Sequence, residues 1–545
     1  MLFNSIEFIV FFLPLTLIVF FQIGGRGQHR LAVAWLVFAS LFFYGWWNYS
    51  YLILLVSSIL VNYFIGNLLQ RKNTKNKQEK PHLKKNKQSI NQRLSRKALL
   101  VFGIVLNLSL IGYFKYANFF VNTINEIVKT DIVLQRIILP LAISFFTFQQ
   151  IAYLIDAYQQ KTEEYNFLDY CLFVSFFPQL IAGPIVHHKD IIPQFYKKNI
   201  YKFRLENLSI GSTIFILGLF KKIVFADSIA IYATPVFNSA AQGNPPTFFY
   251  AWGAALAYTM QLYFDFSGYS DMAIGVARMF GIKLPLNFNS PYKSINISDF
   301  WRRWHITLSN FLRDYIYIPL GGNRRGKLRR NLNLMITMLL GGLWHGAGWN
   351  FILWGGLHGT FLICNHQWHS FRKMLGHDLK KHHWFSKIFG CLFTYLAIVI
   401  GWVFFRAENL NTAWLILEGM VGKHGIALPS LIANKLVPLK LLLESLGARF
   451  PEYGAQDFVL TYISLFILHL IVWFTPNTTQ WLENYQPVIE SKINHKLVKN
   501  NLINLWSQLR WQPSVLSGLI VGLLVFIITK TIVIAPASEF LYFNF

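Results

Sequence analysis

The chain has 545 residues, of which 54% are hydrophobic and only 14% are charged. A soluble globular domain carries about 25% charged residues, so this composition excludes an ordinary soluble enzyme and indicates an integral membrane protein. The formal net charge of +26 could suggest nucleic-acid binding. However, the basic residues cluster in short loops between apolar runs, as the positive-inside rule predicts for a membrane protein. We therefore expect membrane lipids as the surroundings and no nucleic-acid partner.

Apolar runs long enough to cross a bilayer recur along the whole chain. A helix needs about 20 predominantly apolar residues to span the hydrocarbon core. The runs predict an all-α, polytopic membrane protein that folds as one domain over residues 1–545. The first run lacks a basic region before it and a small-residue cleavage site after it, so we expect it to remain as a helix. The runs are 8–23, 31–47, 51–69, 98–113, 248–264, 388–405, 458–474 and 515–534.

The basic loops predict the orientation of the chain in the membrane. Residues 71–97 carry eleven lysines and arginines against Glu79 alone. Such a segment is expected to be a disordered cytoplasmic loop. Three apolar runs precede it, which places the N-terminus outside, and the last run places the C-terminus outside as well. Residues 422–454 contain prolines and glycines that favour an external loop with short amphipathic helices. The other loops that the rule places inside are 189–204, 293–330 and 492–510.

Three further features limit the chemistry that this chain could perform. Residues 177–184 (FPQLIAGP) break a helix twice. Because irregular backbone persists at membrane depth only where protein buries it or where it lines water, we expect re-entrant segments around a cavity. Cys171, Cys364 and Cys391 lie in apolar segments without metal-ligand spacing, which predicts buried free thiols and no metal site. The chain contains no nucleotide-binding or metalloprotease motif, so any chemistry must take place inside the membrane domain.

The most informative stretch is residues 341–350, Gly-Gly-Leu-Trp-His-Gly-Ala-Gly-Trp-Asn. It places His345 in an apolar segment, where an ionisable side chain is unfavourable and usually marks a site. Imidazole also suits proton transfer near neutral pH. We therefore predict a catalytic role for His345, with Trp344, Trp349 and Trp354 as apolar walls. The alternative is a structural histidine bonded to a helix carbonyl. For the later His358, a packing role is at least as well supported.

A second stretch, residues 299–315, has apolar residues at spacings of three and four. This pattern predicts one amphipathic helix in the membrane interface, capped by Ser298 or Asp299. Arg302 and Arg303 would contact either lipid headgroups or a phosphate-bearing acyl donor. His305 lies one turn beyond Trp301 and could reach into a cavity.

Two other segments carry polar residues within apolar surroundings. In residues 263–272, Asp265 could support a histidine; alternatively Asp265, Ser267 and Asp271 cap helix ends. In residues 144–156, polar side chains recur at helical spacing in an aromatic segment. They could line a tunnel, and hydrogen bonding between helices is the better-supported interpretation.

The motifs of residues 299–320, with Trp301-Arg302-Arg303-Trp304-His305, and the later Trp344-His345-Gly346 resemble those of the membrane-bound O-acyltransferase family. The bacterial branch that O-acetylates alginate and peptidoglycan is similar over nearly the whole chain. Further segments that resemble this branch are 1–5, 178–185, 263–271 and 542–545.

The resemblance implies a funnel of about a dozen transmembrane helices with re-entrant and interfacial helices. It implies that the family's invariant histidine corresponds to His345 and its second, less strictly kept polar position to His305. We expect His345 to act as the general base, with Asp265, Trp344 and Asn350 in support. Arg302 and Arg303 would bind the donor. We expect no tightly bound cofactor and no metal; acetyl-CoA or another acyl thioester would serve as donor substrate from the cytoplasm.

On this interpretation the protein lies in the bacterial inner membrane with both termini in the periplasm. It would move an acyl group, expected to be acetyl, across the membrane for O-acetylation of a cell-surface or extracellular polysaccharide. The chain contains no periplasmic acetyltransferase domain, so the acceptor would be a separate periplasmic acetyltransferase or the polysaccharide itself. Three alternatives stay open: D-alanyl transfer from a carrier protein to teichoic acid, a transporter whose histidines relay protons, and a scaffold that anchors a periplasmic enzyme.

Overall fold

The computed structural model confirms the all-α class. It contains no β-strand in the residues that it describes, only isolated bridges between Pro285 and Ile489 and between Ala427 and Arg449. The described residues are 1–70, 90–135, 137–163, 165–378, 383–435, 437–445, 447–452, 454–489, 510–534 and 538–541. The segment 542–545, which contributes to the resemblance, lies outside them.

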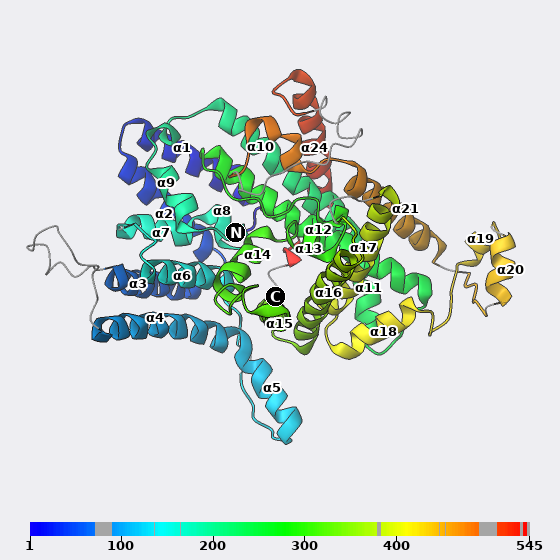
Figure 1. Ribbon diagram of the computed structural model, residues 1–545. Coiled ribbons are helices and arrows are strands. Elements are labelled where there is room, and N and C mark those ends of the chain that lie inside the picture. The colour runs from blue at the N-terminus through cyan, green and yellow to red at the C-terminus, as the bar shows by residue number, and fades with distance from the viewer. Residues whose placement is uncertain are drawn as a thin grey trace, which may run out of the picture. The chain divides into compact units, whose positions relative to one another are not determined.

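The chain forms two compact units that are not consecutive in sequence. The first unit contains residues 1–212, 273–285 and 487–490. Its helices are α1 (Leu13–Gly25), α2 (His29–Gly45), α3 (Tyr49–Gln70), α4 (Ile90–Ile111), α5 (Ala117–Val128), α6 (Ile143–Tyr158), α7 (Phe167–Ser175), α8 (Phe177–Leu180) and α9 (His188–Phe195). Helix α6 packs against α3 and α4, and α7 packs against α2 and α3. A π-helical segment, Glu7–Phe12, precedes the first helix (Figure 1).

The second unit contains residues 213–272, 286–486 and 491–545. It holds both predicted histidines. Two helices, α10 (Leu205–Phe220) and α12 (Phe248–Met279), have residues in each unit. The other helices of the second unit are α11 (Asp227–Ala241), α13 (Ile297–Trp301), α14 (Ile306–Leu312), α15 (Gly326–His345), α16 (Trp349–Met374), α17 (Trp384–Arg406), α18 (Leu410–Met420), α19 (Ser430–Ala433), α20 (Val437–Ser445), α21 (Ala455–Phe474), α22 (Thr478–Trp481) and α24 (Val515–Ile534).

Six helices in the described part of the chain are long and apolar enough to cross a membrane. This confirms a polytopic membrane protein. The number is below the dozen that the resemblance implies, because helices such as α12, α15 and α16 are long but carry more polar residues. The predicted run 248–264, for example, continues in α12 into a segment with buried carboxylates. The six spans are Glu7–Gly25, Tyr49–Gln70, Leu94–Val128, Trp384–Arg406, Ala455–Phe474 and Val515–Ile534.

The loops differ in part from the expectation. Helix α4 begins at Ile90, inside the predicted loop 71–97, and residues 71–89 lie outside the described residues. The loop 422–454 contains two short helices, α19 and α20, as predicted. The helix breaks at 177–184 are confirmed, since α7 ends at Ser175 and the one-turn α8 ends at Leu180. The membrane side of each loop and the cavity around the re-entrant segments stay predictions.

Hydrogen bonds between helices hold the first unit together. Gln150 on α6 donates through Nε2 to Ser58 Oγ on α3 at 3.0 Å, and its Oε1 accepts from the hydroxyl of Tyr170 on α7 at 3.3 Å. The interhelical interpretation of the polar residues in 144–156 is therefore confirmed for Gln150. A second buried network joins His188 Nε2 to Asp156 at 3.2 Å and His188 Nδ1 to the hydroxyl of Tyr165 at 3.0 Å.

The three cysteines are free thiols, as predicted. Cys171 is buried and Cys391 is half-buried, but Cys364 is exposed, so the prediction of burial is wrong for that residue. In the described residues, no group of three or more His, Cys, Asp or Glu side chains is placed to hold a metal ion. The expectation that the protein binds no metal stays an expectation.

Candidate active site

The site is built where α15 meets α16, which pack against each other (Figure 1). A Cβ atom on Gly342 of α15 would lie 2.2 Å from the carbonyl oxygen of Phe351, and one on Gly355 of α16 would lie 2.3 Å from that of Met338. Only glycine allows two helices to approach this closely. The glycines near His345 therefore serve the packing of two helices, and they fix the end of α15, where His345 is the last residue.

This packing predicts a large effect for a single methyl group. Gly342→Ala should lower stability by about 1–3 kcal/mol, because the added atom overlaps a backbone oxygen that cannot rotate away. It should also reduce activity, since the helix end that carries His345 must shift. Gly356→Ala is the matched control, because its Cβ would meet only Leu339 Cδ2 at an ordinary 3.6 Å. Thermal unfolding in detergent would measure both variants, and equal midpoints for the two would contradict this account of the packing.

His345 lies among aromatic rings and is 4% exposed. The ring centroids of Trp344 and Trp354 are each 5.0 Å from that of its imidazole, and Phe405 is at 5.2 Å. The predicted walls are therefore present for Trp344 and Trp354, whereas Trp349 is 49% exposed.

Asn350 fixes the start of α16. Its Nδ2 donates to the carbonyl oxygens of Phe404 at 3.3 Å and Ala407 at 2.8 Å, at the end of α17. Asn350 thus links α16 to α17 next to the residues that surround His345.

The single helix predicted for 299–315 is wrong. Helix α13 ends at Trp301 and α14 begins at Ile306. The cap of α13 is Asn296, whose side chain accepts from the Asp299 N–H at 2.9 Å, and neither Ser298 nor Asp299 caps it. The break has a local cause: His305 has φ +42° and ψ +54°, a left-handed conformation through which a right-handed helix does not continue.

Two properties of His305 are typical of a residue in a functional site. The first is its left-handed backbone. Such conformations cost about 1–3 kcal/mol in non-glycine residues and concentrate at functional sites. The second property is full burial combined with a specific partner. Nδ1 of His305 lies 3.0 Å from Oδ1 of Asn287, an oxygen that also accepts from the hydroxyl of Thr307 at 2.9 Å. Asn287 in turn donates to Ser270 Oγ at 3.2 Å.

These contacts assign the tautomer of His305. An amide oxygen can only accept, so Nδ1 carries the proton and Nε2 carries the lone pair. His305 lies outside the six candidate spans, and burial lowers its pKa to about 3, which keeps the ring neutral at physiological pH. Sequence reasoning missed Asn287, because residues 285–288 (PLNF) match no recognisable motif.

The structure brings the two predicted histidines together. The ring centroids of His305 and His345 are 6.5 Å apart, and Trp344 lies 6.1 Å from His305. Both imidazoles are almost completely buried. A single substrate group could therefore contact both rings inside a water-poor environment.

The two predicted donor-binding arginines differ in the structure. Arg303 is half-buried and forms an ion pair with Asp299 at 3.0 Å. Arg302 is exposed. Arg330 and His369 lie close enough to act on His366 of α16 together with Arg302, so several basic side chains gather near Arg302.

Asp265 neither supports a histidine nor caps a helix end in the structure. Together with Ser267 and Asp271 it lies inside the continuous helix α12, so the capping interpretation is wrong. Its carboxylate is paired with Lys222 Nζ at 2.8 Å and accepts from the Leu541 N–H at 3.1 Å. Asp265 therefore holds a buried cation and the segment 538–541 rather than a histidine.

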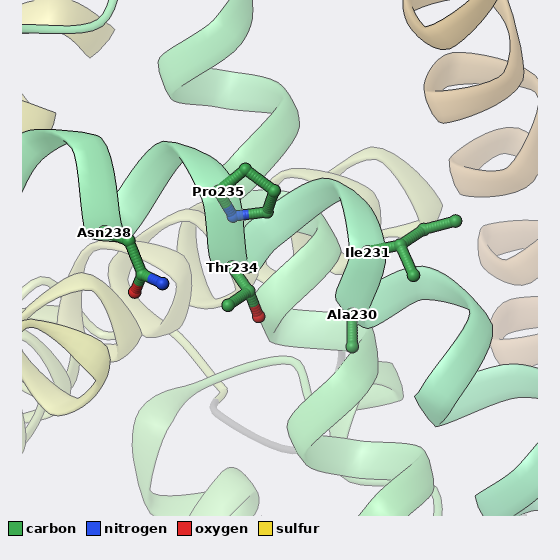
Figure 2. A pocket seen from close by; sticks show the side chains of 5 residues that line it. All are labelled: Ala230, Ile231, Thr234, Pro235 and Asn238. Carbon is green, nitrogen blue, oxygen red and sulfur yellow. The ribbon is translucent and has the colours of Figure 1, made fainter. Parts of the chain in front are cut away.

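A surface hollow of about 580 Å³ lies along α11, lined by the residues that Figure 2 shows. Pro235 lies inside this helix, where it cannot donate a backbone hydrogen bond. None of the predicted site residues lines this hollow. Its lining residues are Ala230, Ile231, Thr234, Pro235 and Asn238.

The structure thus shows an integral membrane protein whose helical second unit carries two neighbouring buried histidines. Residues 38–407 match the model of the membrane-bound O-acyltransferase family. This match covers more than half of the 545 residues, so the chain belongs to that family and is an acyltransferase.

Curated relatives agree with this assignment. The chain is 46% identical over 455 residues to a peptidoglycan O-acetyltransferase of Helicobacter pylori, which covers 78% of this chain and 81% of the relative. It is 42% identical over 430 residues to a probable alginate O-acetylase, AlgI, of Pseudomonas aeruginosa, with 77% and 75% covered. A teichoic acid D-alanyltransferase of Streptococcus thermophilus is 30% identical over 294 residues, which are 50% of this chain and 69% of the relative. The resemblance noted from the motifs is thereby confirmed.

Proposed function

We propose that this protein transfers an acetyl group from a cytoplasmic thioester, such as acetyl-CoA, across the bacterial inner membrane for O-acetylation of an alginate-like polysaccharide or of peptidoglycan. The observation that carries the proposal is the buried pair His305 and His345, with ring centroids 6.5 Å apart. Similarity to relatives named as O-acetyltransferases of peptidoglycan and alginate supports the acetyl group and the glycan acceptor.

In this mechanism His345 is the general base. It takes the proton from an acceptor hydroxyl, whose oxygen attacks the carbonyl carbon of the thioester. The new carbon–oxygen bond forms as the carbon–sulfur bond breaks, and the proton passes from His345 to the leaving thiolate. The aromatic walls exclude water, which protects the thioester from hydrolysis.

His305 assists from a fixed orientation. Its Nδ1–H is committed to Asn287, so Nε2 is the ring nitrogen that can accept a hydrogen bond. A neutral imidazole in this tautomer cannot donate a hydrogen bond to the thioester carbonyl from Nε2. His305 would therefore hold an N–H of His345 or of the substrate in one orientation and would not polarise the carbonyl.

Arg302 would attract the phosphate groups of the donor. We expect Arg302→Glu to raise the KM for acetyl-CoA about tenfold at low salt, with little change in kcat, because an exposed charge acts mainly on encounter and binding. The effect should shrink as salt is added, because ions screen exposed charges over about 10 Å at 0.1 M. Initial rates at several salt concentrations would measure it.

Two comparisons control this prediction. Lys435→Glu makes the same charge change at an exposed residue remote from the site in sequence, and it should leave the KM unchanged. Arg303→Ala should lower stability instead, because Arg303 is tied to Asp299. An unchanged KM for Arg302→Glu at low salt would contradict donor guidance by this residue.

The proposal is tested with purified protein in vesicles that are supplied with labelled acetyl-CoA, a periplasmic acetyltransferase partner, and alginate or peptidoglycan. The expected product is a labelled ester that mild base removes. Labelled product only with a D-alanylated carrier protein would favour teichoic acid chemistry, for which the similarity covers half of this chain. Label that crosses the membrane without any ester would favour a transporter, and histidine substitutions without effect would favour a scaffold. We place both termini on the periplasmic side of the membrane in this scheme.

A further inference from the structure

Helix α5 has an apolar face that the described residues leave uncovered. Phe120 is 53% exposed, Ile124 is 47% exposed and Ile127 is 75% exposed, and no residue of α5 is buried. These three residues recur at spacings of four and three, so they lie on one face of the helix. Asn122 and Glu126, which are also exposed, lie on the opposite face. Exposed apolar faces of this kind mark sites of lipid or protein contact.

A bend separates α5 from the helix before it. Leu94–Val128 is one apolar stretch of 35 residues. At 1.5 Å per residue it would be about 52 Å long, whereas the hydrocarbon core of a bilayer is about 30 Å thick. A π-helical segment, Gly112–Tyr116, lies between α4 and α5, and such segments are a usual cause of helix bends. Figure 1 shows α5 turning away from the line of α4. The bend thus divides a stretch that is too long for one span.

Arg96 marks the level of one membrane interface. Its Nη2 donates to the carbonyl oxygens of Leu69 at 2.8 Å and Tyr158 at 3.1 Å, in the last turns of α3 and α6. A guanidinium at the ends of apolar helices is expected at the interface and not in the hydrocarbon. Tyr116 follows Arg96 by 20 residues, and a helix of that length crosses the core once, over about 30 Å. The bend therefore lies at the opposite interface.

The chain is at this same interface again after α5. Trp46, Trp47 and Tyr49, between α2 and α3, are exposed, as aromatic residues often are at a membrane interface. The hydroxyl of Tyr51, in the first turn of α3, donates to the carbonyl oxygen of Ile138 at 3.1 Å. The chain therefore leaves the level of the interface after the bend and is back at it by Ile138.

Residues 117–135, which we call the α5 hairpin, are held together by their own hydrogen bonds. Asn125 Nδ2 donates to the carbonyl oxygen of Ile132 at 2.9 Å. Asn125 Oδ1 accepts from the Ile132 N–H at 3.1 Å and from the hydroxyl of Thr130 at 2.9 Å. The returning arm is apolar as well, and its Val133 is 91% exposed. Since α5 carries a single charged residue, Glu126, the hairpin offers apolar contact and little charge.

We propose that the α5 hairpin is a lipid-binding element. It lies in the membrane interface at the C-terminal end of α4, with Phe120, Ile124 and Ile127 among the acyl chains. Asn122 and Glu126 then face water. An amphipathic helix in this position binds the bilayer through the apolar area that it buries.

The level of the hairpin favours lipid over a protein partner, because both ends of the hairpin lie at the interface. The bend also removes the mismatch between a 35-residue apolar stretch and the thickness of the hydrocarbon core. The element fixes the depth of α4 in the membrane. It goes beyond the proposed function and does not depend on which group the protein transfers.

The test is a scan of nitroxide labels along α5 in the full-length protein, reconstituted in phosphatidylcholine vesicles. Each label is attached to one introduced cysteine, after the two thiols that are not buried are removed by Cys364→Ser and Cys391→Ser. Collisions with oxygen report contact with acyl chains, and collisions with a water-soluble nickel chelate report contact with water. We expect the ratio of the two rates to oscillate with a period of about 3.6 residues, high for Ile124→Cys and Ile127→Cys and low for Asn122→Cys.

A charge on the apolar face provides a second check. Ile127→Glu should lower the ratio measured at Ile124→Cys toward that of Asn122→Cys, because a carboxylate among acyl chains is unfavourable. Asn122→Glu, on the opposite face, is the matched control and should leave the ratio at Ile124→Cys unchanged. Equal effects of the two glutamates would contradict the proposed orientation of the hairpin.

Other surroundings of α5 give other patterns. Oxygen contact on every side would show a spanning helix, and chelate contact on every side would show a helix in water. Low collision rates with both reagents along the apolar face would show that a protein partner or a second copy of the chain covers it. Any of these three results would overturn the proposal. A wild-type unfolding midpoint establishes that each labelled protein is folded, and the pattern can be read whether or not acetyl transfer is found.

Discussion

His345→Ala should reduce the rate of acyl transfer by a factor of about 10² to 10⁴, the usual contribution of a general base. The loss should appear in kcat, because the imidazole acts on the proton that moves in the transition state. Its effect on stability should be smaller than its effect on the rate, although truncation of a ring packed against Trp344, Trp354 and Phe405 leaves a cavity. Initial rates of labelled acetyl transfer would provide the measurement.

The control must be a histidine outside the site. His377 is exposed, so His377→Ala should transfer acetyl groups at the wild-type rate. Thermal unfolding and chromatographic homogeneity of both variants would establish that each is folded. A folded His345→Ala protein with near-wild-type turnover would contradict the assignment of the base.

Lys222→Met should lower the free energy of unfolding by about 3–5 kcal/mol, because it leaves the Asp265 carboxylate buried without its cation. Both side chains are 2% exposed and their ion pair is 2.8 Å long. Lys222 also donates to the carbonyl oxygen of Glu539 at 3.0 Å and lies 5.0 Å from the ring centroid of Phe540. Its loss should therefore also release the segment 538–541. Chemical unfolding in detergent and limited proteolysis would measure the two effects.

A double variant separates structure from catalysis at this pair. Replacing both buried partners, as in Lys222→Met with Asp265→Leu, removes the unpaired buried charge and should recover most of the lost stability. Only Asp227, which pairs with Lys222 at 2.7 Å and is 28% exposed, then lacks its cation. We expect the double variant to retain substantial acyl transfer, because Asp265 contacts Lys222 and Leu541 instead of a histidine. A stable double variant without activity would instead give Asp265 a direct role in the reaction.

Much of the fold could be predicted from apolar runs of bilayer length, because burial of long apolar segments in lipid is a local property of the sequence. The last run, 515–534, coincides with α24. His345 could also be predicted, since an ionisable residue in an apolar segment is unusual wherever it occurs. The two-histidine site followed from the family resemblance rather than from any spacing rule.

Other features depend on contacts between residues that are distant in sequence. The break between α13 and α14 results from the left-handed backbone of His305, which Asn287 stabilises from outside the motif. The pairing of Asp265 with Lys222 likewise joins separate helices, so neither a helper nor a cap could be chosen from residues 263–272 alone. The structure also shows that the backbone in contact with Gly342 is that of α16.

The central claim is that buried His345 connects a cytoplasmic thioester with an acceptor on the opposite side of the membrane. Sealed vesicles in which all protein molecules have the same orientation test this claim directly. Labelled acetyl-CoA is supplied on one side, and the periplasmic acetyltransferase and its glycan are supplied on the other. We predict labelled ester on the far side when acetyl-CoA faces the basic surface near Arg302, and a loss of at least about 10²-fold with His345→Ala. Ester formation at the same rate in the wild type and in a folded His345→Ala protein, or only when donor and acceptor share one side, would contradict the account.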